Sequence, residues 1–346
     1  MTDSLQDSMR RPLGQAAVAA LAALLLCTAC SAADDSGTGG ACTQARCDST
    51  CRSGGRPGGT CIGDVCSCLG GGGDADAGTD GDGGGDDVGD GCDERARWIY
   101  IVSAENQLIR FYPDELRLEP VGTLDCTPTG TGATPFSMSV DRSATAWVLY
   151  GPGLFGGNAG ELFRVSTVDA HCESTTFERN QEGLEVFGMG FSSDEAGGDR
   201  ETLFIGGGPQ LSIGTGTSTL ATIDMAALRV GSIGPLPGWP ELTGTGAAEL
   251  WGFFPDTDPP SVSKIDKASG NVSDTYDLPI DTTSTEAWAF AFWGGDFWIF
   301  LKTLADSSTN IWKLETDDRS VTNVYPDIGQ RIVGAGVSTC APIILR

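Results

Sequence analysis

Five polar residues recur at one fixed place in a repeated pattern of the chain, and their types suit acid–base or ligand chemistry. Each lies four positions before the middle of a small-x-small triplet: Thr134, Glu185, Glu241, Glu286 and Arg331. Three carboxyl groups and a guanidinium that converge can hydrogen-bond a ligand, or supply an acid and a base or nucleophile for glycoside hydrolysis. The alternative interpretation is that each residue is a charged strand end that faces water.

The triplets belong to a unit of roughly 47 residues that recurs five times, a period typical of propeller blades. The triplets are Ser137-Met138-Ser139, Gly188-Met189-Gly190, Gly244-Thr245-Gly246, Ala289-Phe290-Ala291 and Gly334-Ala335-Gly336. Each unit also has an aromatic hydrophobic segment, which begins at Trp98, Trp147, Leu203, Leu250 and Phe297. An apolar-x-x-apolar segment and a more polar one follow. Four short strands per unit predict an all-β, five-bladed β-propeller over residues 92–346.

The small triplets are predicted to form the innermost strands, because strands that converge on a narrow axis leave no space for large side chains. The chain ends with such a strand, residues 332–337, and the propeller begins with an aromatic strand, so the termini are expected to complete one blade together. Cys92 and Cys340 flank that junction and are predicted to form a disulfide. Cys126 and Cys172 remain as a second pair. The five polar residues then surround the mouth of the central channel.

Polar residues also occur in the loops between the second and third strands, which gather at the same mouth. They are Asn106, Asn158, Gln210 and Asp306. Their side chains suit hydrogen bonds to sugars or peptides.

The aromatic residues are assigned mainly structural roles. Trp147, Trp251 and Trp298 share one strand position and are predicted to pack between blades. Trp239 and Trp293 lie outside that position and are expected to be less constrained. The single histidine, His171, has no matching serine or cysteine nucleophile, so no catalytic triad is predicted. No cofactor is expected.

Composition excludes one class of partner. The chain has 346 residues, 40% of them hydrophobic, and a formal net charge of -26. A phosphate backbone needs a basic surface to displace its counterions, so no nucleic-acid partner is expected. Part of the acidity lies in a Gly/Asp tract over residues 70–91, which has almost nothing apolar to bury and is predicted to be a disordered linker. The tract lacks the downstream glutamate of an EF-hand loop, so no metal site is predicted.

Residues 1–30 have the pattern of a secretion signal. Arg10 and Arg11 precede an apolar run, residues 13–26, that is too short to span a membrane comfortably. The segment Thr28-Ala29-Cys30 resembles the bacterial lipobox, which implies a lipoprotein whose signal peptide is removed and whose Cys30 is lipidated. The alternative is ordinary cleavage near Ala33. Acyl chains would anchor the protein to a bacterial membrane, at the outer membrane or cell surface, with the folded domains outside it.

Six cysteines gather in a short module over residues 42–69. They are Cys42, Cys47, Cys51, Cys61, Cys66 and Cys68. An even set of cysteines in an exported chain predicts disulfide bonds, for which fifteen pairings exist. Cys47 and Cys51 share one face of a helix, and Cys66 and Cys68 share one face of a strand, so two disulfides that join helix to sheet are favoured.

This spacing resembles the cysteine-stabilised αβ fold of invertebrate and bacterial defensin-like peptides. The resemblance covers residues 42–68 and rests also on the segments Gly54–Cys61 and Val65–Cys68. It implies the pairs Cys42–Cys61, Cys47–Cys66 and Cys51–Cys68. The basic residues of the module are nearly offset by aspartates and it has no aromatic residue, so a recognition or spacer role is expected rather than attack on membranes.

The sequence therefore predicts a lipoprotein-type signal peptide (1–30), a short linker (31–41), the six-cysteine module (42–69), a Gly/Asp linker (70–91) and the propeller (92–346). The repeat domain also resembles that of uncharacterised bacterial lipoproteins. We expect an exported, lipid-anchored surface protein, a monomer, whose propeller binds an extracellular carbohydrate or protein ligand without catalysis. Two alternatives are a glycoside hydrolase that uses the axial carboxylates and a defensin-like effector carried by the propeller.

Overall fold

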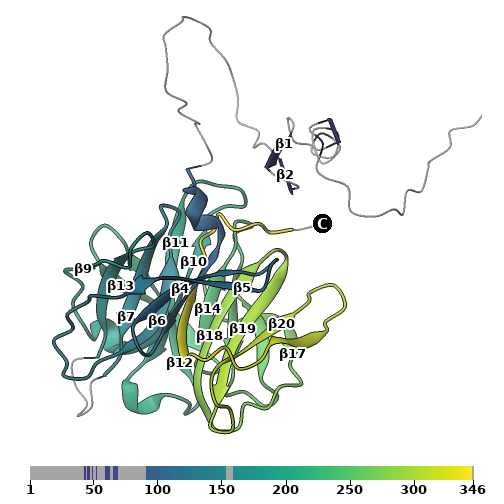
Figure 1. Cartoon of the computed structure of the whole chain (residues 1–346). Helices are drawn as coiled ribbons and strands as arrows, with labels where there is room; N and C mark the ends of the chain where they lie inside the picture. The colour runs from purple at the N-terminus through teal and green to yellow at the C-terminus, as the bar shows by residue number, and fades with distance from the viewer. Residues whose placement is uncertain are drawn as a thin grey trace, which may run out of the picture.

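The computed structural model describes residues 91–152 and 159–344 and, before them, positions 43, 45, 46, 49, 52, 59–62 and 65–68 (Figure 1). In this earlier part, positions 45, 46, 49 and 52 are helical. Strands β1 (Gly59–Ile62) and β2 (Val65–Cys68) pair antiparallel, with Cys61 opposite Cys66. The signal peptide, Cys30, Asn158, the Gly/Asp linker and the pairing of the six module cysteines lie outside the described residues and side chains.

Five antiparallel sheets of four strands form the rest of the described chain, so the predicted five-bladed propeller is confirmed. Blade 1 contains β22 (Ile332–Gly336), β3 (Ile99–Ser103), β4 (Gln107–Tyr112) and β5 (Arg117–Thr123). Blade 2 contains β6 (Pro135–Val140), β7 (Thr145–Tyr150), β8 (Glu161–Ser166) and β9 (Cys172–Ser174). Blade 3 contains β10 (Val186–Ser193), β11 (Glu201–Gly208), β12 (Ser218–Asp224) and β13 (Arg229–Leu236).

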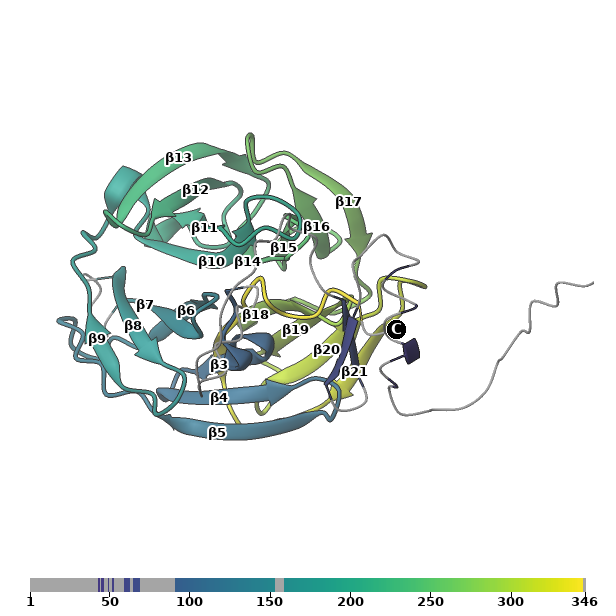
Figure 2. The same ribbon diagram turned by 90° about the horizontal axis from the view of Figure 1, so that it is seen from above.

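Two further blades complete the ring. Blade 4 contains β14 (Glu241–Gly244), β15 (Leu250–Phe254), β16 (Ser261–Ile265) and β17 (Val272–Asp277). Blade 5 contains β18 (Thr285–Trp293), β19 (Asp296–Thr303), β20 (Asn310–Leu314) and β21 (Val321–Tyr325). Three short 3-10 helices connect strands: η1 (Glu94–Arg97), η2 (Gln181–Gly183) and η3 (Gln210–Ser212). Figure 2 shows the sheets arranged radially, with β6, β10, β14 and β18 near the centre and β5, β9, β13 and β17 at the rim.

The five inner strands contact each other in a ring around the axis, and small residues make this approach possible. A Cβ atom on Gly188 would lie 2.3 Å from the carbonyl oxygen of Pro240, and one on Gly334 would lie 2.7 Å from the backbone nitrogen of Met138. Such distances leave no room for even a methyl group. The prediction that small residues form the innermost strands is therefore confirmed for these blades.

The register of blade 4 differs from the predicted one by three residues. Thr243 pairs with Trp251, just as Ser139 pairs with Trp147 and Ala291 with Trp298. The residues of blade 4 that match the other triplets are therefore Glu241, Leu242 and Thr243, and the predicted triplet Gly244-Thr245-Gly246 lies at and beyond the strand end. Strand pairing decides the register, and the small-x-small pattern occurs by coincidence just downstream.

Hydrophobic clusters fill the five gaps between neighbouring blades. Trp147, Trp251 and Trp298 each belong to one of these clusters, in agreement with their predicted packing role. Trp239 and Trp293 are both only 3% exposed, so the expectation that they are less constrained is wrong. The indole nitrogen of Trp293 donates a hydrogen bond of 2.8 Å to the carbonyl oxygen of Arg97, which ties blade 5 to the start of blade 1.

The two ends of the propeller meet in blade 1, where β22 pairs with β3. Both predicted disulfides are present, Cys92–Cys340 beside this closure and Cys126–Cys172 between blades 1 and 2. After β22 the chain crosses one face of the propeller, opposite the face where the inner strands begin. There Glu201 accepts hydrogen bonds from the Arg142 amide (2.8 Å) and the Thr339 hydroxyl (2.7 Å). This C-terminal segment therefore connects blades 1, 2 and 3.

Loss of the closing disulfide should destabilise the propeller more than loss of the other one. The Cys92–Cys340 bond closes a loop of 248 residues, against 46 residues for Cys126–Cys172. In the chain-entropy model the longer loop gives about 1.5 kcal/mol more stabilisation. Denaturant unfolding of the Cys92→Ala/Cys340→Ala and Cys126→Ala/Cys172→Ala variants measures this difference. Equal losses would contradict a special role for the closure.

A methyl group at the axis should also be costly. We expect Gly188→Ala to lower the free energy of unfolding by about 1 to 3 kcal/mol, because the added carbon meets backbone atoms that cannot move aside easily. Gly231→Ala is the matched control: Gly231 is also in a strand, and its nearest neighbour would be the Thr222 hydroxyl at 3.6 Å. Urea unfolding of both variants tests the expectation, and a Gly188→Ala variant as stable as the control would refute it.

Candidate binding site at the channel mouth

Three inner strands carry a β-bulge close to the point where they start. The pairing with the second strand skips Phe136 in blade 2, Glu286 in blade 5 and Val333 in blade 1. A bulge turns the side chain of the extra residue away from its regular direction. We call the face of the propeller where the inner strands begin the mouth face.

A cavity of about 160 Å³ opens on the mouth face, and residues of four blades line it. The lining residues are Thr134, Pro135 and Phe136 of blade 2, Glu241 of blade 4, Glu286, Ala287 and Trp288 of blade 5, and Arg331 and Val333 of blade 1. Four of the five residues predicted to surround the mouth are therefore in one cavity. The three bulged residues are among the lining residues too. We call this space the mouth cavity.

Glu241 is the deepest ionisable group of the mouth cavity. It is only 3% exposed, and its Oε2 accepts a hydrogen bond of 2.9 Å from the Ser137 hydroxyl of blade 2. The side chain reaches Ser137 past Gly188, whose missing Cβ leaves the space beside Glu241. Burial raises the pKa of Glu241 well above its ordinary value, although hydrogen bonds from Ser137 and the Met189 amide act in the opposite direction. Burial therefore favours the protonated, uncharged form of Glu241.

The buried position of Glu241 corrects the sequence prediction, which placed all five residues at equivalent points of the mouth. With the observed register, Glu241 occupies the position of Ser137 and Ala289. This position lies three residues further along the inner strand than those of Glu286 and Arg331. No sequence pattern indicated this, because a glutamate at an axial position breaks the small-residue rule that identified the strands.

The charged residues at the rim of the mouth cavity differ in their pairing. The carboxylate of Glu286 forms an ion pair with Lys302 Nζ, which also donates to the carbonyl oxygen of Thr303 at 3.2 Å. Arg331 is exposed, and its guanidinium has no hydrogen-bond or ion-pair partner among the described residues. Among the described residues, the cavity thus has one carboxylate paired with a lysine, one acid whose uncharged form is favoured by burial, and one guanidinium without a partner.

The side chains of Glu185, Asn106 and Asp306 form hydrogen bonds to other groups of the protein. Glu185 does not line the mouth cavity. Its carboxylate accepts a hydrogen bond of 2.9 Å from the backbone N–H of Gln210 at the start of η3. Asn106 accepts a hydrogen bond of 2.7 Å from the Tyr150 hydroxyl. Asp306 accepts a hydrogen bond of 2.8 Å from the backbone N–H of Thr303, within its own loop. These groups stabilise loops around the mouth.

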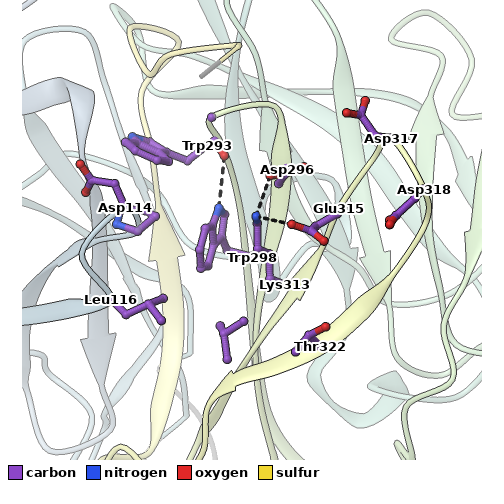
Figure 3. Close-up of a pocket in the computed structure, with 13 residues that line it drawn as sticks. Asp114, Leu116, Trp293, Asp296, Trp298, Lys313, Glu315, Asp317, Asp318 and Thr322 are labelled. Carbon is purple, nitrogen blue, oxygen red and sulfur yellow. Dashed lines mark hydrogen bonds and ion pairs between the residues drawn. The ribbon is translucent and has the colours of Figure 1, made fainter. Parts of the chain in front are cut away.

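A larger groove of about 770 Å³ lies between blades 1 and 5 at the opposite face, and sequence patterns did not indicate it (Figure 3). The turn after β4 and the β18–β19 and β20–β21 turns form its walls. Lys313 within it is paired with Asp296 (3.1 Å) and Glu315 (2.8 Å). Trp293 and Trp298 are buried to 97% and thus present no open ring face for stacking on a sugar. The groove is therefore a weaker candidate than the mouth cavity.

The described part of the chain contains neither a metal-binding cluster nor a membrane-spanning helix. No group of three or more histidine, cysteine, aspartate or glutamate side chains there is arranged to hold a metal ion. Across the same residues, no helix combines the length and the apolar character needed to cross a membrane.

Comparison with known proteins gives fold similarities at low identity. No protein-family model and no curated protein sequence matches the chain. TolB from Acinetobacter baumannii has a TM-score of 0.40 and 12% identity, and the match covers 66% of this chain and 52% of TolB. A gluconolactonase from Xanthomonas campestris has a TM-score of 0.37 and 15% identity, and the match covers 58% of this chain and 67% of the gluconolactonase. An exo-β-1,3-galactanase from Phanerochaete chrysosporium has a TM-score of 0.41 and 9% identity, and the match covers 64% of this chain and 53% of the galactanase.

The chain thus spans about half the length of TolB and of the galactanase. At this level of similarity the comparisons carry no argument about function. The five-bladed architecture rests on the strand order of the chain itself.

Replacement of Glu241 by glutamine should change how stability depends on pH. Above pH 4.5 this carboxyl ionises in the unfolded chain, whereas burial in the folded chain raises its pKa and favours the protonated form, so the free energy of unfolding falls as the pH rises toward the folded-state pKa. Glu201, whose pKa burial raises to about 7, has the same effect between pH 4.5 and 7. Glu241→Gln should remove about 1 to 3 kcal/mol of the decline between pH 5 and 8.

Urea unfolding of the parent and of Glu241→Gln at pH 5 and pH 8 measures this change. Glu173→Gln, at a carboxylate whose side chain is 61% exposed, serves as the control and should keep the parent's pH dependence. If Glu241→Gln showed the same decline as the parent, the carboxyl would be ionised in the folded protein.

Proposed function

We propose that this protein is a secreted, lipid-anchored surface protein whose propeller binds an extracellular carbohydrate or protein ligand at the mouth cavity without chemical turnover. The observation that carries the proposal is the mouth cavity itself. Thr134, Glu241, Glu286 and Arg331 come from four different blades and line one space together with the apolar residues Phe136 and Val333. A concave site with a few convergent polar groups on apolar walls is the usual form of a ligand site.

The pairing of the carboxyl groups supports binding over hydrolysis. A glycoside hydrolase needs one carboxylic acid and a second carboxylate free to act as base or nucleophile. Burial raises the pKa of Glu241, which suits an acid, but the carboxylate of Glu286 is engaged by Lys302. Glu185 is not in the cavity. Because Glu241 and Glu286 do line the same cavity, hydrolysis is the second candidate function.

Two features support export. The propeller contains the disulfides Cys92–Cys340 and Cys126–Cys172, and disulfides persist mainly in proteins that leave the reducing cytoplasm. The signal pattern over residues 1–30 and the lipobox-like segment at Cys30 agree with that compartment. We propose that the defensin-like module at residues 42–69 acts as a recognition element or spacer between the anchor and the propeller.

Binding without turnover can be measured on an immobilised polysaccharide panel with the purified full-length protein. We expect saturable binding to at least one panel member, loss of that binding in Thr134→Trp, which fills the mouth cavity, and no release of reducing sugar. Val168→Trp, at a residue of the β8–β9 turn that is 61% exposed, is the matched control and should bind like the parent.

Release of reducing sugar by the parent that is abolished in Glu241→Gln/Glu286→Gln would establish the hydrolase instead. Equal binding by the parent and Thr134→Trp would place the site elsewhere on the molecule.

A further inference from the structure

We infer that the group received by the mouth cavity is a carboxylate, and that Arg331 is its anchor. This inference rests on the proposed binding site and names the chemistry of its ligand. It follows from the charge, the hydrogen-bond donors and the size of the cavity.

The charge balance of the mouth cavity is opposite to that of the chain. The whole protein has a formal net charge of -26. In the cavity, Lys302 compensates the carboxylate of Glu286, and the guanidinium of Arg331 has no partner among the described residues. One positive charge is therefore left over at the place where four blades converge. An anionic ligand is the natural partner of an unpaired guanidinium.

Burial of Glu241 strengthens this balance. If Glu241 were ionised, its carboxylate would offset the charge of Arg331, and the cavity would not favour an anion. Its pKa is raised well above the ordinary value because the carboxyl is almost completely desolvated. The protonated form that burial favours adds no negative charge and has an O–H group that can donate to a ligand.

The donors of the cavity match a carboxylate better than other anions. A guanidinium presents parallel N–H groups that bind the two oxygens of a carboxylate together. The hydroxyl of Thr134, which makes no side-chain hydrogen bond to another described residue, adds a neutral donor. Arg331 supplies one positive charge without a partner among the described residues, which leaves the second charge of a dianion such as a phosphate monoester unbalanced. A single free cation and neutral donors therefore suit a monoanion.

The size of the mouth cavity limits what can enter. A volume of about 160 Å³ has room for several water molecules, well below the 300 to 1,000 Å³ of sites that enclose a whole drug-sized ligand. A carboxylate with a short stem fits, and Phe136, Ala287 and Val333 supply an apolar wall beside such a stem. The remainder of a larger ligand would stay outside the cavity.

Two sources of the carboxylate can be separated by experiment: an acidic sugar, or the free carboxyl end of a peptide. Binding is measured with the full-length protein by saturation-transfer NMR and calorimetry at up to about 10 mM probe. The sugar arm uses glucuronate, galacturonate and N-acetylneuraminate, with glucose as neutral control. The peptide arm uses N-acetyl-dialanine, with its C-terminal amide as control. Glucuronate and N-acetyl-dialanine each differ from their control only at the carboxylate.

Substitutions at Arg331 and Glu286 should change the affinity in opposite directions. Arg331→Gln should weaken binding of the carboxylate probe about tenfold or more, and Arg331→Lys should fall between it and the parent. Glu286→Gln should tighten binding, because it removes the like charge beside the ligand. Arg200→Gln is the matched control, since that side chain is 76% exposed in the β10–β11 loop, and it should leave the affinity unchanged.

Each outcome has a definite meaning. Binding of a carboxylate in one arm, with none to its neutral control, supports the inference and identifies the source. No binding of any carboxylate at about 10 mM, or unchanged affinity in Arg331→Gln, overturns the inference. Binding of a neutral polysaccharide that Thr134→Trp abolishes would overturn it as well, but would keep the proposed binding function.

Discussion

The close approach of five inner strands to one axis is the constraint on which the rest of this structure depends. Gly188 and Gly334 lie so near the neighbouring backbone that no Cβ fits between them, and the ring can close only with small residues at these positions. One position departs from this rule. Glu241 places a long polar side chain in the layer that elsewhere holds Ser137, Gly188, Ala289 and Gly334, and the absence of a Cβ on Gly188 leaves the space that it needs.

The properties of the mouth cavity follow from that exception. A carboxyl group between packed strands loses its hydration, so its uncharged form is favoured, and the Ser137 hydroxyl and Met189 amide keep its oxygens hydrogen-bonded. Glu241 lines the mouth cavity from this axial layer of the inner strands. Beta-bulges at Phe136, Glu286 and Val333 then set which side chains form its walls. Small differences in backbone pairing thus decide the chemistry of the site.

Closure of the ring explains why the two ends of the propeller matter as much as its middle. Pairing of β22 with β3 joins segments more than 200 residues apart, and the Cys92–Cys340 bond fixes the same junction covalently. The C-terminal segment continues to Arg142 of blade 2 and Glu201 of blade 3, opposite the mouth. Among the described residues, it is the end of the axis opposite the mouth face that this segment crosses.

The sequence by itself determined the number of blades, the shared first blade and both propeller disulfides, because repeat length, small residues and cysteine positions follow directly from covalent order. It also identified Thr134, Glu286 and Arg331 at the strand starts. Only the tertiary structure decided the register of blade 4, since Gly244-Thr245-Gly246 fits the local pattern as well as any triplet and only pairing of Thr243 with Trp251 rules it out. The pairing of Glu286 with Lys302, the burial of Glu241 and the groove between blades 1 and 5 likewise depend on contacts between residues distant in the chain, which local patterns do not encode.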